Sequence, residues 1–142
     1  MTHIIHPTAD GVAITTPTGE VPIEQVAEQV APDGIYAIVT VDAIPADTTF
    51  RGAWAYANGS IEIDLDKAKK ITHNLRRAMR AEEFAPLDQT IAFRLPGATI
   101  KETEKSREKV RDKYAEMQEE IDLTTDVEQL KVLLEAYKEK AE

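Results

Sequence analysis

The feature that most constrains the fold is a change of composition at Asp64. Five of the six glycines and five of the seven prolines precede this residue, together with short apolar runs typical of β-strands. The rest of the chain is dominated by Glu, Lys, Arg, Ala and Leu in helical periods. We therefore predict an α+β protein with a small β-rich head, residues 1–64, and a helical tail, residues 65–142.

Two hairpins are predicted in the head. Residues His3–His6 and Val12–Thr16 form strand-like runs around Asp10-Gly11, a pair that favours a tight reversal. The stretch Trp54–Asp64 alternates apolar and polar or small residues around Asn58-Gly59, the strongest type I′ turn signal in the chain.

One helix and one further strand are expected between the hairpins. Ile23, Val26, Ala27 and Val30 have helical spacing, and they predict a short amphipathic helix that has Pro22 in its first turn. The run Ile35–Val41 is rich in β-branched residues and apolar on both faces. We predict that it is the central strand of the sheet.

The tail begins with a helix that Asp64 is expected to cap. Basic residues are assigned to its other faces: Lys69, Lys70, Arg76, Arg77 and Arg80. Pro86 predicts a kink or break at 85–86, after which Leu87, Ile91 and Leu95 resume the pattern, and Pro96-Gly97 predicts a break at 96–99. The apolar stripe before Pro86 consists of Leu65, Ala68, Ile71, Leu75, Ala78 and Met79.

Two later segments carry a spacing of alternating three and four residues, which favours helix pairing. A capping box at Thr125 and Glu128 opens the second segment. Its phase differs from that of the first, so we predict a turn at 122–126 and an antiparallel helical hairpin. Whether these seams close within one chain or between chains is left open. They consist of Ile100, Thr103, Arg107, Val110, Tyr114, Met117 and Ile121, and then of Val127, Leu130, Leu134, Tyr137 and Ala141.

Charge argues against general binding of nucleic acid. The chain has 26 acidic and 17 basic residues, a net charge of −9. Residues 1–64 carry −8, residues 65–100 carry +3 and residues 101–142 carry −4. The basic group Lys67, Lys69, Lys70, Arg76, Arg77 and Arg80 lacks interleaved aromatic residues. We interpret it as a salt-bridge surface within the chain or between subunits.

No catalytic, cofactor or metal site is predicted. The chain has no cysteine and no motif for phosphate, dinucleotide or zinc binding. His3 and His6 would point to opposite faces of a strand, and His73 is expected to be a solvated helix residue. Nor is there an apolar run long enough to span a membrane.

Protein partners are therefore the expected ligands. Trp54 is interpreted first as a core anchor where head meets tail and second as an interface hot spot. The candidate interface residues are Val110, Tyr114, Met117, Ile121, Val127, Leu130, Leu134, Tyr137, Phe50, Arg51 and Trp54.

Three segments also carry a resemblance to a known group of proteins. They are Asp42–Trp54, with the string Pro45-Ala46-Asp47, Phe50-Arg51 and Ala53-Trp54, then Ile63–Lys69, and then Leu75–Ala78 with Leu87-Asp88. In residues 30–95 the chain resembles small proteins of tailed bacteriophages encoded near tail and tail-fibre genes. Those proteins are regarded as virion-associated proteins or assembly chaperones.

The resemblance implies a non-enzymatic role and no catalytic residues. The leading expectation is a tail or tail-fibre assembly protein that binds a structural partner or itself. Two alternatives stay open: a minor virion component that oligomerises through its C-terminal helices, and an acidic factor that binds and inhibits a host protein. The expected location is the cytoplasm of the infected bacterial host, or the virion.

Overall fold

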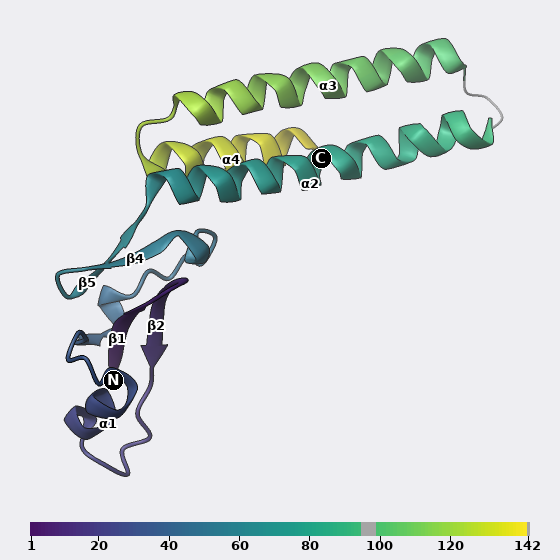
Figure 1. The fold of residues 1–142 in the computed structure, drawn as a ribbon. Coiled ribbons are helices and arrows are strands. Elements are labelled where there is room, and N and C mark those ends of the chain that lie inside the picture. Colours follow the sequence, from purple (N-terminus) through teal and green to yellow (C-terminus); the bar gives the residue numbers. More distant parts are fainter. Residues whose placement is uncertain (95–98, 142) are drawn as a thin grey trace. The chain divides into compact units, whose positions relative to one another are not determined.

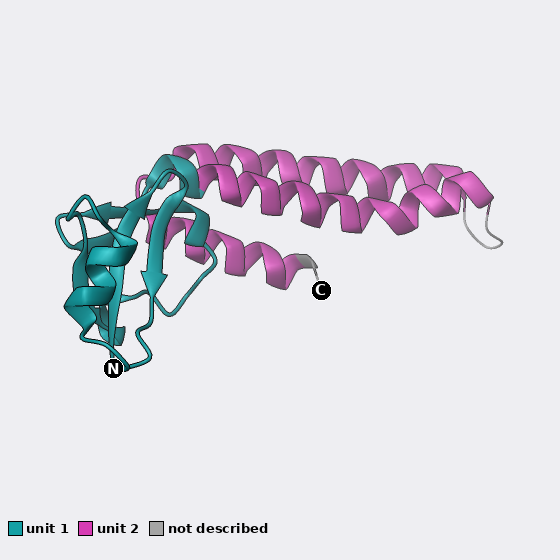
Figure 2. Ribbon diagram, turned by 60° about the horizontal axis from the view of Figure 1, so that its bottom comes forward, with its two compact units in different colours: residues 1–68 teal, residues 69–142 magenta. Residues whose placement is uncertain are grey.

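The computed structural model describes residues 1–94 and 99–141, and it has the α+β architecture that the sequence predicts. Strands lie in the N-terminal part and long helices in the C-terminal part (Figure 1). The chain separates into two compact units, residues 1–68 and 69–142 (Figure 2). The division therefore falls in the first turn of the helix that follows Asp64, and each unit is described by itself.

The head contains a three-stranded antiparallel sheet of order β2-β1-β3. β1 (Thr2–Thr8) and β2 (Gly11–Thr15) form the first predicted hairpin. Gly11 has a φ of +146°, and a Cβ atom there would lie 3.2 Å from the carbonyl oxygen of Trp54. Glycine thus allows both the turn and the close approach of β4.

The prediction of a central strand at Ile35–Val41 is wrong. The strand β3 (Ala37–Thr40) is shorter and lies at the edge of the sheet, and the central strand is β1. Ile4 and Ile5 of β1 are fully buried, one on each face. Apolar residues on both faces therefore did not distinguish the two strands, because a strand becomes central only through the partners that pair with its two edges.

The second hairpin is confirmed as β4 (Trp54–Ala57) and β5 (Ser60–Ile63). Its turn residues Asn58 and Gly59 both have positive φ, 49° and 87°, as a type I′ turn requires. The core of the head joins the two hairpins. Ile5, Val12 and Trp54 form its buried centre, and Ile14, Ala37, Val39, Ile44, Tyr56, Ile61 and Ile63 pack around it.

The short helix of the head is also confirmed. α1 (Ile23–Val30) follows Pro22, whose carbonyl accepts a hydrogen bond from the Gln25 amide at 3.0 Å. Ala27 is its buried residue. Two 3₁₀ turns, η1 (Val41–Ala43) and η2 (Arg51–Ala53), complete the connections between the strands.

The first tail helix, α2 (Leu65–Phe93), begins where the sequence predicts. The Asp64 Oδ1 atom accepts a hydrogen bond from the Lys67 amide at 3.1 Å, as expected of a capping residue. The helix has no break at 85–86 and continues through Pro86. Pro86 has no amide hydrogen to donate to the carbonyl of Glu82, four residues earlier. Glu82 and Pro86 are both exposed, so solvent can bind this carbonyl instead.

α2 pairs with α3 (Ile100–Leu123), an arrangement that the sequence analysis did not anticipate. His73 contacts Asp122, Glu83 contacts Lys113 and Asp88 contacts Arg107. As the residue number increases along α2, the number of the partner residue in α3 decreases, so the two helices are antiparallel. The predicted break at 96–99 falls mostly on residues 95–98, which lie outside the described residues together with the predicted apolar position Leu95.

α4 (Val127–Ala141) turns back along α3 and completes the predicted antiparallel helical hairpin (Figure 1). The connection is shorter than 122–126, because α3 extends to Leu123. The cap is shifted by one residue from the prediction. Asp126 Oδ1 accepts from the Gln129 amide at 2.9 Å, and Gln129 Oε1 accepts from the Thr125 amide at 2.8 Å.

The predicted stripe of α2 needs one correction. Ile71, Leu75 and Met79 are half-buried, but Ala78 is exposed and Arg76, which was assigned to another face, is only 8% exposed. Arg76 shares a groove with Ala115 and Gln118 of α3. The antiparallel partner thus covers a face of α2 that is offset from the most apolar one.

Candidate partner-binding groove

The seams of the helical unit close within the chain itself. Six predicted interface residues are at most 2% exposed: Tyr114, Met117, Ile121, Leu130, Leu134 and Tyr137. The rings of Tyr114 and Tyr137 lie 6.5 Å apart between α3 and α4. In this fold these six residues form the core of the unit, and of the six only Tyr137 also lines the groove described next.

The remaining candidates are divided between core and surface. Val110 and Val127 are half-buried in the helical unit, and the side chain of Ala141 lies outside the described residues. In the head, Phe50 and Trp54 are buried. Arg51 is exposed, and its guanidinium lies 4.6 Å from the centre of the Trp54 ring. Trp54 is thus part of the core of the head, with its ring contacted by a surface arginine.

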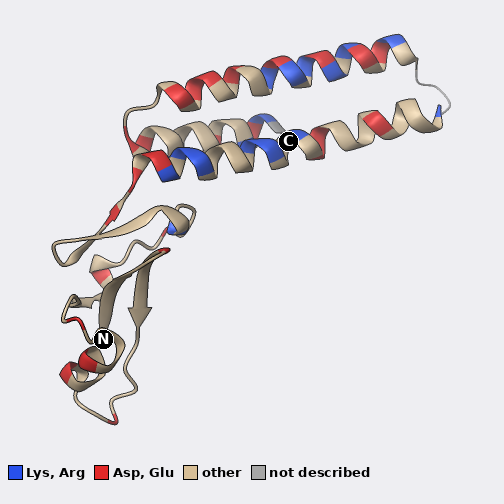
Figure 3. Ribbon diagram, viewed as in Figure 1, with Lys and Arg blue, Asp and Glu red and all other residues tan. Residues whose placement is uncertain are grey.

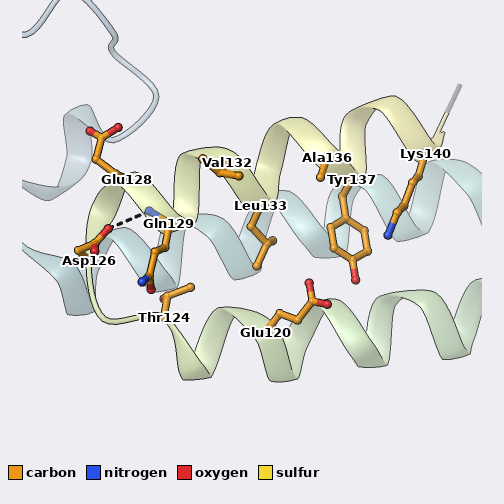
Figure 4. A pocket seen from close by; sticks show the side chains of 10 residues that line it. All are labelled: Glu120, Thr124, Asp126, Glu128, Gln129, Val132, Leu133, Ala136, Tyr137 and Lys140. Carbon is orange, nitrogen blue, oxygen red and sulfur yellow. Dashed lines mark hydrogen bonds between the residues drawn. The ribbon is translucent and has the colours of Figure 1, made fainter.

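An apolar groove lies on the outer side of the α3–α4 hairpin, next to the buried seam (Figure 4). Its volume is about 630 Å³, and Val132 on its wall is 70% exposed. Leu133 and Tyr137 point from α4 toward Glu120 of α3 and Thr124, the residue that follows α3 (Figure 4). The lining residues are Glu120, Thr124, Asp126, Glu128, Gln129, Val132, Leu133, Ala136, Tyr137 and Lys140.

The groove arises because α4 carries two apolar rows. The first row, Leu130, Leu134 and Tyr137, is buried. The second row, with Val132, Leu133 and Ala136, follows at helical spacing on the adjacent face and lines the groove. Sequence reasoning missed this second row, although the nearly continuous apolar run 132–137 was its signal.

Charged residues lie around this apolar wall. Glu120, Asp126 and Glu128 contribute acidic groups, and the ammonium nitrogen of Lys140 lies 4.5 Å from the centre of the Tyr137 ring. Burial, aided by the nearby carboxylates of Glu120 and Glu116, raises the pKa of Tyr137 to about 12. Its hydroxyl is therefore neutral at physiological pH.

A second exposed apolar surface lies in the head. β3 has β1 on one side only, and Ile38 in this edge strand is 39% exposed. Ile35 before the strand and Val41 after it are 50% and 59% exposed. An edge strand of this kind presents unpaired backbone groups to which another strand can add.

His3 and His73 each have a polar partner in the structure. His3 Nδ1 lies 2.9 Å from the Thr16 hydroxyl, and His73 Nε2 lies 2.8 Å from Asp122 Oδ1. No local sequence pattern indicates the Asp122 partner, because the contact joins two different helices. Within residues 1–94 and 99–141, no group of three or more His, Asp or Glu side chains is arranged to hold a metal ion.

The comparisons with known proteins leave the function to be inferred from these surfaces. No protein-family model, curated protein or solved structure matches the chain. Among the described helices, none combines the length and the apolar character needed to cross a membrane.

Proposed function

We propose that this chain is a non-enzymatic assembly protein that binds a structural partner, and that the α3–α4 groove is the binding surface. The observation that supports the proposal most directly is the exposure of Val132, an apolar residue of the groove wall that is 70% exposed. Exposed apolar grooves with a charged rim are typical of protein interaction sites.

The shape of the groove favours an amphipathic helix as its ligand. Gln129, Val132, Leu133 and Ala136 recur one turn apart along α4, and helices dock by placing apolar residues of the same spacing into such a row. The acidic residues Glu120, Asp126 and Glu128 would pair with basic residues on the rim of the partner helix.

The resemblance to small phage proteins suggests the biological setting of this binding. In this setting the partner would be a tail or tail-fibre protein with an apolar helix exposed before assembly, and a small acidic protein that covers the helix would keep the partner soluble. The site of action would be the cytoplasm of the infected bacterium. The edge strand β3 offers a second contact of a different kind.

Co-expression with a bacteriophage tail-fibre protein tests this proposal. We expect the chain to raise the soluble fraction of the fibre protein and to co-purify with it, and Val132→Glu to abolish both effects. Gln89→Glu is the matched control, since it also adds one negative charge and Gln89 is an exposed residue of α2 that lines neither this groove nor the hollows between α2 and α3. Equal activity of both variants would contradict the groove assignment.

The two alternative roles give different results. A fixed copy number of the chain in purified virions would identify a virion component instead of a chaperone. Capture of a basic host protein, with no effect on fibre solubility, would favour the host-inhibitor role.

A further inference from the structure

A second groove, between α2 and α3, is lined by arginines. Arg76, Arg77 and Arg80 of α2 and Arg111 of α3 surround a hollow of about 490 Å³ that has no acidic residue in its lining. A neighbouring hollow of about 400 Å³ shares Arg80 and Arg111 and adds Arg107 with its ion-pair partner Asp88. Figure 3 shows Lys and Arg gathered on these two helices, whereas the end of α3 is acidic.

Three of these four arginines, Arg76, Arg77 and Arg80, belong to the basic group for which the sequence predicts a salt-bridge surface. Among the described residues, none of the four guanidinium groups is ion-paired with a carboxylate. Arg77 donates to the Asn74 amide oxygen at 2.8 Å, Arg76 Nε donates to His73 Nδ1 at 3.4 Å, and Arg80 lies over the Phe84 ring. By contrast, Arg107 and Lys113 of α3 pair with Asp88 and Glu83 of α2.

The arginines also repel one another. Arg76 is only 8% exposed, and burial, followed by the charges of Arg77 and Arg80, lowers its pKa from the ordinary arginine value. Asp122 acts in the opposite direction but more weakly. Like charges held together in a partly buried groove are a site at which an anionic ligand would relieve repulsion.

The geometry specifies what kind of anion fits. Arg76 and Arg80 are four residues apart on α2, and Arg111 of the antiparallel α3 lines the same groove. Carboxylates one helical turn apart, about 5–6 Å, match this spacing, and each planar guanidinium can bind a carboxylate through two hydrogen bonds. A long phosphate backbone fits less well than a short acidic helix, because it extends beyond the arginine cluster and meets the acidic remainder of a chain that carries −9.

We propose that this groove binds an acidic protein segment, a helix with Glu or Asp side chains at four-residue spacing. The site is distinct from the apolar α3–α4 groove, because the two linings share no residue. Binding here would be electrostatic and sensitive to salt, and it would give the chain a second attachment point.

The test is a titration of the full chain with a fluorescent helical peptide that carries Glu at every fourth position. Fluorescence anisotropy is measured at low and at high salt. The Arg80→Gln/Arg111→Gln double variant removes two exposed groove residues. Its control, Lys101→Gln/Lys105→Gln, makes the same change of net charge at exposed positions of α3 outside the groove.

We expect saturable binding that salt weakens, with a loss of about tenfold or more for the arginine variant and less than about twofold for the lysine control. Circular dichroism confirms that both variants are folded. Three outcomes would overturn the inference: no saturable binding, equal losses in both variants, or tighter binding of a single-stranded oligonucleotide of equal charge. None of them bears on the Val132 experiment, which tests the other groove.

Discussion

The Nε2 atom of His73 lies 2.8 Å from the Oδ1 atom of Asp122, 49 residues further along the chain. Close by, the ammonium group of Lys69 donates to the backbone carbonyl of Asp122 at 3.1 Å. These contacts connect the beginning of α2 to the end of α3. They also fix the register of the two helices, which the pairs Glu83–Lys113 and Asp88–Arg107 continue along their length.

The His73–Asp122 pair should contribute little free energy in spite of its good geometry. The Asp122 side chain is 60% exposed, so solvent screens the interaction. We expect a double-mutant cycle with His73→Ala and Asp122→Ala to give a coupling of about 0.2–1 kcal/mol by urea denaturation. A coupling energy above this range would mean that the pair is a principal stabilising contact and does more than fix the register of α2 and α3.

The two apolar rows of α4 should respond differently to truncation. Leu134 is 2% exposed, and we expect Leu134→Ala to lower the free energy of unfolding by about 2–5 kcal/mol, because it leaves a cavity between the helices. Val132→Ala, at a residue 70% exposed, should change it by less than about 0.5 kcal/mol. Similar losses in thermal or urea unfolding would contradict the division into core and groove.

Alkaline pH should destabilise the helical unit through Tyr137. Its pKa is raised to about 12 in the folded chain, against about 10 in the unfolded chain. The folded state therefore holds the proton more tightly, and its stabilisation is complete below pH 10 and is lost as the pH rises toward 12.

Unfolding followed by circular dichroism between pH 8 and about 11.5 checks this expectation. Tyr137→Phe removes the titrating group and should reduce the loss of stability in this range. Burial, with Glu83 nearby, also raises the pKa of Tyr114, so a smaller pH dependence should persist in the variant. An unchanged pH profile in Tyr137→Phe would show that Tyr137 is not responsible.

The cap at Asp64 should stabilise the start of α2. Asp64→Ala leaves the Lys67 amide without its side-chain acceptor, and we expect a loss of about 1 kcal/mol in urea unfolding. Asp64→Asn keeps a side-chain oxygen that can accept the hydrogen bond from the Lys67 amide, and it should lower the free energy of unfolding much less. If the two variants lose the same amount, the charge of Asp64 and not its hydrogen bond is what matters.

Local patterns were enough to predict most of the helices and both hairpins. Asn58-Gly59 was sufficient because positive φ at both positions leaves few alternatives to a tight turn. The three- and four-residue spacing likewise selected Tyr114, Met117, Ile121, Leu130 and Leu134, all of which are buried. Such signals depend on neighbours within one or two turns of chain, and therefore appear in the sequence.

The candidate sites were harder to predict. The sequence pointed to the seam as a partner surface, but the chain uses that seam for its own core. Both grooves depend on which helices pair and in what register, as the contacts of His73 and Arg76 illustrate. Local periodicity cannot reveal a contact between two residues that are 49 positions apart in the sequence.

By itself, the sequence determined the α+β class, the turn at Asn58-Gly59, the cap at Asp64 and the buried contacts of Tyr114, Met117, Ile121, Leu130 and Leu134 in the last two helices. Only the tertiary structure decided that β1 is central, that Arg76 is nearly buried, and that Val132 is exposed. The physical reason is that propensity and spacing act over a few residues. Burial and strand order are instead set by the long-range partners that cover each face.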